Sequence, residues 1–159
     1  MKAVIVYGCP CSGKSTYVRE NASERDVIYD FDALLRAVST IAVHTPDEVA
    51  ARWPVFKLRR ALISACKDEA GIETLYILCR WPSDRLAEEL RDIATEYHLV
   101  EATREECKER LAKDDMRPDK SAWTDIIDAW FDAHEGQAYA PEKSMHMQRL
   151  RLELEKIRF

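Results

Sequence analysis

Short apolar runs recur along the chain and predict a small set of buried strands. Each run is bounded by polar residues or by turn-forming residues, as expected for parallel strands that are covered on both faces. The most continuous run covers residues 74–79, where six residues in succession contain no charge. The four expected strands are residues 4–7, 27–29, 74–79 and 98–102.

Apolar residues at helical spacing occupy the segments between these runs. Strands that alternate with helices form right-handed βαβ units, so the sequence predicts an α/β domain with about four parallel strands and helices on both faces. Thr103 and Glu106 have the spacing of a capping box, Ser121 is expected to cap a helix, and Pro54 is expected to kink or break one. The expected helices are residues 14–21, 34–41, 47–70, 82–95, 104–114, 121–136 and 141–159.

Composition is that of one globular domain over residues 1–159. The chain is 47% hydrophobic and 33% charged, with a net charge of -5. This charge argues against a protein that coats nucleic acid with a broad basic surface, but it is compatible with a local basic groove.

We find neither a signal peptide nor a membrane-spanning run, so we expect a cytoplasmic protein with reduced thiols. Cys9 and Cys11 lack the second pair that a zinc site needs.

A phosphate-binding signature follows the first expected strand. Residues 8–15 fit the Walker A pattern G-x-x-x-x-G-K-[ST] at every fixed position, with a strand before it and a helix after it. The glycines let backbone amides surround an anion, Lys14 reaches the β- and γ-phosphates, and Ser15 is the expected Mg²⁺ ligand. The expected nucleotide-binding residues are Gly8, Cys9, Pro10, Cys11, Ser12, Gly13, Lys14, Ser15 and Thr16.

Asp30 and Asp32 end the second expected strand, on the sheet edge where a ligand binds. A carboxylate there can accept the proton of an attacking hydroxyl, which makes Asp32 the candidate catalytic base. On an extended segment the two acids share a face and Phe31 points the other way. Asp30 then orients Asp32 or the substrate, or binds a water on the magnesium. In the alternative, one of the two acids caps the helix that begins near Ala33.

Cations after the fourth strand predict a helical lid over residues 104–120. Arg110, Lys113 and Arg117 recur at three- to four-residue spacing and would share one face of a helix that extends that far. We expect Arg110 and Arg117 to contact the transferred phosphate, since kinases bring cations in from a mobile segment. Interleaved acidic residues leave a solvated helix face as the alternative.

Further arginines are candidates for substrate binding. Arg80 ends the third strand and needs a partner, either a substrate phosphate or an internal acid such as Asp32. The middle helix has basic and aromatic residues that either form a groove for bases and phosphates or divide between solvent and core. These residues are Arg52, Trp53, Phe56, Lys57, Arg59 and Arg60, with Trp81 nearby.

The Walker A residues, followed by a strand that ends in an aspartate, resemble the kinase domain of phage polynucleotide kinase and small phage kinase-like ATP-binding proteins. The resemblance implies an adenylate-kinase-like P-loop NTPase fold in three layers and phosphorylation of 5′-hydroxyl ends. It also implies that Asp32 is the general base. The chain departs from the family in two places: Arg36 lies about one position from the family's substrate-gripping arginine, and Arg80 and Trp81 follow the third strand where the family tends to carry an acid.

These observations predict a phosphotransferase that uses ATP, or another nucleoside triphosphate, with Mg²⁺. The expected acceptor is a single-stranded nucleic-acid end or a nucleoside-like molecule. The alternatives are a nucleotide kinase, a small-molecule phosphotransferase, or an accessory ATP-binding protein that acts through a protein partner. The apolar stripe of residues 141–159 either packs on the domain or holds a second copy of the chain.

Overall fold

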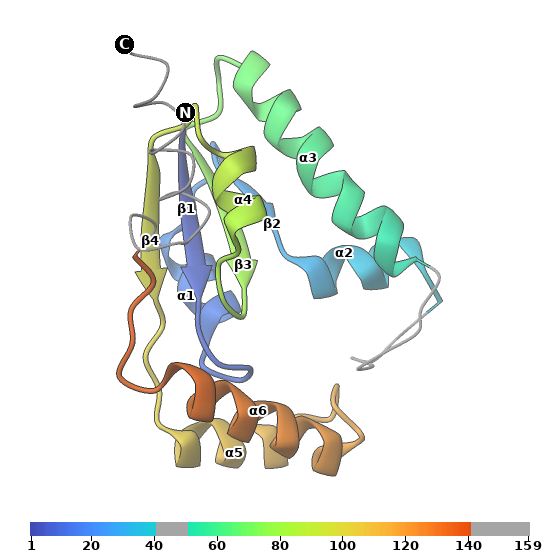
Figure 1. Ribbon diagram of the computed structural model, residues 1–159. Helices are drawn as coiled ribbons and strands as arrows, with labels where there is room; N and C mark the ends of the chain where they lie inside the picture. Colours follow the sequence, from blue (N-terminus) through green and yellow to red (C-terminus); the bar gives the residue numbers. More distant parts are fainter. Residues whose placement is uncertain (41–50, 141–159) are drawn as a thin grey trace.

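A four-stranded, all-parallel sheet forms the centre of the protein (Figure 1). The structure is a computed structural model that describes residues 1–40 and 51–140. The strand order is β2-β3-β1-β4, so β1, which leads into the glycine-rich loop, is central. The predicted fold class and strand number are confirmed. The strands are β1 (Lys2–Tyr7), β2 (Val27–Tyr29), β3 (Thr74–Cys79) and β4 (Thr95–Leu99).

Six helices accompany the sheet within the described residues. The helix expected over residues 141–159 lies outside them, as does the start of the one expected over residues 47–70. None of the helices in the described ranges is long and apolar enough to cross a membrane. The helices are α1 (Lys14–Asn21), α2 (Phe31–Val38), α3 (Arg52–Asp68), α4 (Asp84–Glu89), α5 (Arg104–Ala112) and α6 (Lys120–His134).

The two faces of the sheet have separate cores, because side chains alternate along each strand. On β1, Ile5 and Tyr7 pack with residues of α3 and α4, whereas Val4 and Val6 pack with Val18 of α1. Helices therefore cover both faces, and three layers result. A third apolar cluster joins α5, α6 and the loop after β1.

Several boundaries differ from the sequence prediction. Strand β4 pairs with β1 from Thr95 onward, three residues before its predicted start, and α4 ends at Glu89 instead of residue 95. Apolar residues at helical spacing extend to Ile93, which is why the sequence predicted a longer helix. In the structure the Ile93 amide donates to the Leu90 carbonyl oxygen at 2.8 Å and forms a turn. Helix α3 begins at Arg52, so Pro54 lies in the first turn, where a helix needs no amide hydrogen bond.

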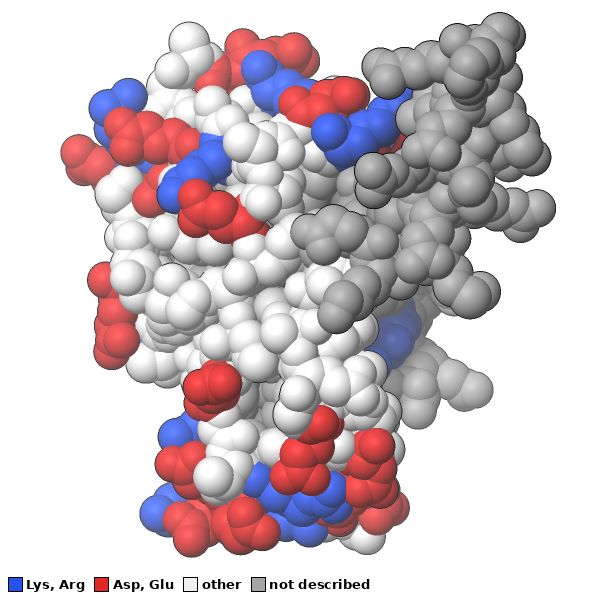
Figure 2. Space-filling view, turned by 60° about the vertical axis from the view of Figure 1, so that its left-hand side comes forward, with Lys and Arg blue, Asp and Glu red and all other residues white. Residues whose placement is uncertain are grey.

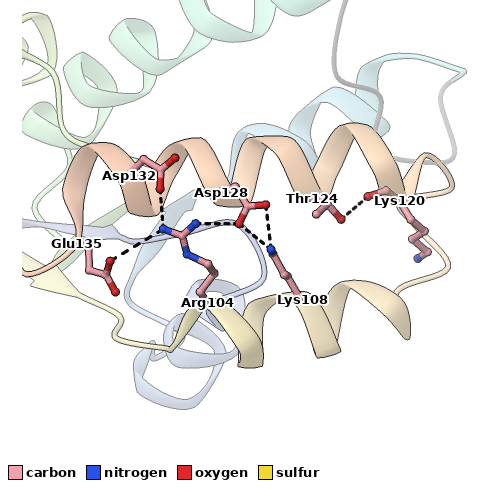
Figure 3. A network of polar contacts seen from close by, with 7 residues as sticks. All are labelled: Arg104, Lys108, Lys120, Thr124, Asp128, Asp132 and Glu135. Atoms are coloured by element: carbon pink, nitrogen blue, oxygen red, sulfur yellow. Dashed lines mark hydrogen bonds and ion pairs between the residues drawn. The ribbon is translucent and has the colours of Figure 1, made fainter.

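Helices α5 and α6 are joined by ion pairs and by an apolar seam (Figure 3). The predicted capping box at Thr103 and Glu106 starts α5. Arg104 binds Asp128 at 3.0 Å and Asp132 at 2.7 Å, and Lys108 also binds Asp128 at 2.7 Å. These contacts hold α5 and α6 together.

Helix α6 begins with Asp119 as its N-cap and not with Ser121, which corrects the sequence prediction. The Asp119 carboxylate accepts from the Ala122 amide at 2.9 Å, so Ser121 lies within the first turn. We expect Asp119→Ala to lower the free energy of unfolding by about 1 kcal/mol. Ser121→Ala should change it by less than about 0.5 kcal/mol. Denaturant unfolding of both variants measures this, and a larger loss for Ser121→Ala would contradict the assignment.

Candidate functional site

The loop between β1 and α1 has a backbone that only glycine allows at two points. Gly8 has φ +151°, and a Cβ there would lie 2.7 Å from the Val100 carbonyl oxygen. Gly13 has φ +108° and precedes the first residue of α1. No side chain of the described residues caps α1. Its first amides therefore face the end of the loop, in the arrangement that binds anions in other proteins.

Lys14 is a half-buried cation without a carboxylate partner among the described residues. Its Nζ donates to the carbonyl oxygens of Gly8 at 2.9 Å and Cys9 at 2.7 Å. Burial lowers the pKa of Lys14. A desolvated ammonium that contacts only neutral oxygens gains free energy when an anion approaches it. This position therefore favours binding of a negatively charged group.

Asp30 connects the loop to α2. Its carboxylate accepts from the Ser15 hydroxyl at 3.2 Å and from the amides of Asp32 and Ala33 at 3.0 and 3.2 Å. Asp30 is thus the N-cap of α2, and Asp32 lies in the first helical turn. The expectation that both acids share a face of an extended segment is wrong, because the helix begins at Phe31. The alternative, in which one acid caps this helix, is confirmed.

A cleft of about 610 Å³ brings most of the predicted residues together. It is lined by the loop, the start of α1, the ends of β2 and β3, the N-terminal parts of α2 and α3, and residues of α5, of α6 and of the segment between them. Seven lysines or arginines but only three aspartates line it. The cleft is therefore basic although the whole chain is acidic. From the loop, the lining residues are Pro10, Cys11, Gly13, Lys14, Ser15 and Thr16.

Gly8, Cys9 and Ser12 lie beneath this surface. Cys9 is 1% exposed and packs in the α5–α6 cluster with Cys107. Its hydrogen bond with Cys107, together with burial, raises the pKa of the Cys9 thiol. All five cysteines are free thiols, and the described residues contain no group of three or more metal-ligating side chains. Cys9 therefore joins the loop to α5 by packing.

The cations after β4 reach the cleft, but not from one helix face. Helix α5 ends at Ala112 and Lys113 is its C-cap, so Arg117 lies beyond the helix. The expectation of a shared helical face is therefore wrong, although Arg110, Lys113 and Arg117 all line the cleft. Arg110 donates to the carbonyl oxygens of Cys11 at 3.2 Å and Ser12 at 2.7 Å.

Arg117 is placed by two contacts. Its guanidinium pairs with Asp114 and lies 4.7 Å from the centre of the Trp123 ring. Both neighbours also line the cleft. Arg117 thus holds the segment between α5 and α6 against this wall.

The two remaining predicted substrate-binding residues are placed differently. Arg80 lines the cleft and makes no ion pair within residues 1–40 and 51–140. Arg36 is half-buried on α2, outside the residues that line the cleft. Of the two arginines, only Arg80 is therefore available to a ligand in the cleft.

Helix α3 supplies part of the cleft wall through three of the basic and aromatic residues named above as a possible groove, and sequence reasoning missed only the ion pair that places Arg59. Arg52, Phe56 and Arg59 all line the cleft, and Arg59 forms an ion pair with Glu89 of α4 at 2.9 Å. Their spacing of four and three residues places them on one helical face, although Arg60, four residues after Phe56, has similar spacing and does not line the cleft. Glu89 has no comparable sequence signal, since it is one of several acids in its helix.

Charge outside the cleft is mixed on the side shown in Figure 2. Acidic and basic side chains alternate at the two ends of that face, with a mostly uncharged band between them. Helices α5 and α6 carry the ion pairs of Arg104 and Lys108 with Asp128 (Figure 3). Across the described part of this face, basic residues do not form a continuous surface.

No protein-family model and no curated protein matches this chain. Among solved structures, the unliganded crystal structure of a sugar kinase from a Janibacter species is similar. The two chains superpose with a TM-score of 0.56 and 21% sequence identity, over 91% of this chain and 82% of that chain. This likeness shows that the chain has a kinase-like α/β fold with a small parallel sheet.

Proposed function

We propose that the protein is a P-loop kinase that transfers the γ-phosphoryl group of ATP, with Mg²⁺, to a hydroxyl acceptor. The observation that carries this proposal is that Asp32 lines the same cleft as Lys14 and the N-terminus of α1. A cation for the phosphates and a carboxylate for the acceptor are the two components that phosphoryl transfer requires of a protein.

The reaction assigned to this site is an in-line displacement. The acceptor oxygen bonds to the γ-phosphorus while its proton passes to the Asp32 carboxylate. The bond between the γ-phosphorus and the β–γ bridging oxygen breaks, and ADP leaves with the electron pair. In this proposal, Lys14, the α1 amides and Arg110 compensate the negative charge on the phosphate oxygens.

The residues present fit a magnesium ion that arrives with the nucleotide. Ser15 would hold it directly, and Asp30, 3.2 Å from the Ser15 hydroxyl, would bind one of its waters. When bound, the ion neutralises charge on the β- and γ-phosphates. Such an ion does not need a complete set of protein ligands, because phosphate oxygens and water fill the remaining positions.

For the acceptor we propose a polynucleotide 5′-hydroxyl or a nucleoside-like molecule. Support comes from the excess of cations in the cleft. The Phe31 and Phe56 rings also line the cleft, with their centres 4.4 Å apart, and aromatic rings of this kind can stack on bases. A sugar-like small molecule is the second candidate, favoured by the structural likeness to a sugar kinase. In both cases the chemistry at Asp32 is the same.

An acceptor panel tests this proposal. ADP formation from ATP and Mg²⁺ is measured with 5′-hydroxyl DNA and RNA oligonucleotides, nucleosides, nucleoside monophosphates, sugars, and buffer alone. We expect at least one hydroxyl acceptor to raise the rate well above the buffer rate, with oligonucleotides or nucleosides ahead of sugars. Turnover that no acceptor changes would reject the kinase and favour an accessory ATPase.

A further inference from the structure

Two buried thiols belong to elements that meet beside the glycine-rich loop. Cys9 lies in the loop between β1 and α1, and Cys107 lies in α5. Both side chains pack in the apolar cluster that joins the loop to α5 and α6, where they are 1% and 0% exposed. The two thiols are hydrogen-bonded to each other, although they come from distant parts of the sequence. Loop and helix are therefore in contact through a pair of sulfur atoms.

The hydrogen bond makes the two thiols chemically different. The Cys9 S–H donates to Cys107, which lowers the pKa of the Cys107 thiol and, together with burial, raises the pKa of Cys9. Burial opposes the shift at Cys107, and the charges of Arg110 and Lys14 add to it. The thiolate is the form that reacts with a peroxide. Cys107 is therefore the nucleophile of the pair, and Cys9 is the thiol next to it.

The other three cysteines lack such a partner. Burial raises the pKa of Cys66 and of Cys79, to about 12 for Cys79. Within residues 1–40 and 51–140, neither of them forms a hydrogen bond with another thiol. Cys11 is half-buried and lines the cleft, and burial raises the pKa of its thiol too. A disulfide is thus favoured at Cys9 and Cys107.

The backbone of Cys9 contacts the loop lysine. Its carbonyl oxygen accepts from the Lys14 Nζ at 2.7 Å. Arg110, three residues after Cys107 on α5, donates to the Ser12 carbonyl oxygen at 2.7 Å. A disulfide holds its two sulfur atoms about 2.05 Å apart, which is closer than two hydrogen-bonded thiols, so this bond would draw Cys9 toward α5. The loop would then change shape at the carbonyl that positions Lys14.

We propose that a peroxide oxidises Cys9 and Cys107 to a disulfide, and that this bond weakens nucleotide binding at the loop until a thiol reductant breaks it. The Cys107 thiolate attacks one oxygen of hydrogen peroxide, the O–O bond breaks, and a sulfenic acid and one water form. The Cys9 sulfur then attacks the Cys107 sulfur, and the hydroxyl group leaves with the Cys9 proton as a second water. The two thiols lose two electrons and two protons, and the peroxide gains them.

Access to the pair depends on local movement of the loop. Both sulfur atoms are covered while the loop packs on α5, so a peroxide reaches them when the two part locally. A nucleotide held by Lys14 and the α1 amides stabilises the closed arrangement. The pairing of the thiols is independent of the proposed function, whereas the link to nucleotide binding rests on it.

Peptide mapping and nucleotide binding test the proposal on the full chain. The protein is treated with hydrogen peroxide, the remaining thiols are alkylated, and non-reduced peptides are analysed by mass spectrometry. We expect a linked pair of peptides that contain Cys9 and Cys107, and a Kd for a fluorescent ATP analogue that rises about tenfold or more. Dithiothreitol should reverse both changes. A non-hydrolysable ATP analogue with Mg²⁺, added before the peroxide, should slow formation of the linked pair.

Cys107→Ala is the test variant, because Cys107 lies outside the loop and a small apolar side chain suits its buried position. It should bind nucleotide as the reduced wild type does and should not respond to peroxide. Cys107→Ser should behave in the same way, which separates the result from a packing defect of either variant. Cys66→Ala is the matched control, since Cys66 is 2% exposed in a different core cluster. Cys66→Ala and Cys11→Ser should both keep the peroxide response.

Three results overturn the inference. The first is oxidised protein without the linked Cys9–Cys107 peptides. The second is a rise in Kd that persists in Cys107→Ala and disappears in Cys11→Ser, which assigns the effect to Cys11. The third is a linked pair that leaves Kd unchanged. Failure of the proposed function differs: a reduced protein that binds nucleotide but phosphorylates no acceptor rejects the kinase and leaves this test intact, whereas one that binds no nucleotide overturns both.

Discussion

Replacing Asp32 by asparagine is expected to lower the rate of phosphoryl transfer by about 10²- to 10⁴-fold. Asparagine keeps the shape of the side chain but cannot accept the proton of the attacking hydroxyl. The measurement is the single-turnover rate of labelled phosphate transfer at saturating ATP and acceptor. Nucleotide affinity should remain near the wild-type value, because Asp30 contacts Ser15 and caps α2.

Asp125→Asn is the control for this substitution. Asp125 is exposed on α6 and does not line the cleft, so its removal changes the charge of the protein without changing the site. The control should transfer phosphate at the wild-type rate. A wild-type rate in Asp32→Asn itself would show that another group accepts the proton.

Replacing Lys14 by alanine is expected to lower the transfer rate by about 10²- to 10³-fold, together with a loss of nucleotide affinity. The ammonium donates to the Gly8 and Cys9 carbonyl oxygens of the loop, and no neighbouring lysine replaces it on α1. Equilibrium binding of a fluorescent ATP analogue and the single-turnover rate measure the two effects. Lys57→Ala, at an exposed position of α3, is the control.

The same variant separates function from folding. Lys14 is half-buried and desolvation lowers its pKa, so its charge is held in the nucleotide-free protein at a free-energy cost. We therefore expect Lys14→Ala to unfold at the wild-type temperature or above it in the absence of nucleotide. Added ATP and Mg²⁺ should raise the unfolding temperature of the wild type but not of the variant. A variant that unfolds well below the wild type would instead mean that Lys14 supports the fold.

The loop and its strand context were predictable because their signal is local. Gly8 and Gly13 occupy positions whose backbone geometry admits no other residue, and residues 8–15 fit the motif at each fixed position. The strands β1, β2 and β3 were likewise visible as uninterrupted apolar runs. The capping box at Thr103 was found for the same reason, since it depends on residues three apart.

Features that depend on tertiary contacts were less predictable. The apolar spacing after β3 continued through Ile93, but pairing of Thr95 with Ala3 of β1 ended α4 early. Asp30 was expected on an extended segment because its role as N-cap depends on where α2 begins. The Arg59–Glu89 ion pair joins residues that are 30 positions apart, and nothing in either local pattern indicates it.

The contact between Arg110 and the loop also depends on tertiary structure, because it joins residues that are far apart in the sequence. Its guanidinium binds the Cys11 and Ser12 carbonyl oxygens across 99 and 98 positions of sequence, and Cys9 packs into the same α5–α6 cluster. Helical spacing suggested that Arg110 contacts phosphate, but it did not predict that this side chain also fixes the loop. Arg110 therefore links the position of α5 to the shape of the proposed nucleotide site.

The most direct test of the central claim is the fate of the γ-phosphate. With enzyme in excess over γ-labelled ATP, Mg²⁺ present and a saturating hydroxyl acceptor identified by the panel, the label is followed into the acceptor and into inorganic phosphate. We predict that most of the label appears on the acceptor hydroxyl and that Asp32→Asn removes this product. Label that appears only as inorganic phosphate, at the same rate in wild type and Asp32→Asn, would contradict the account.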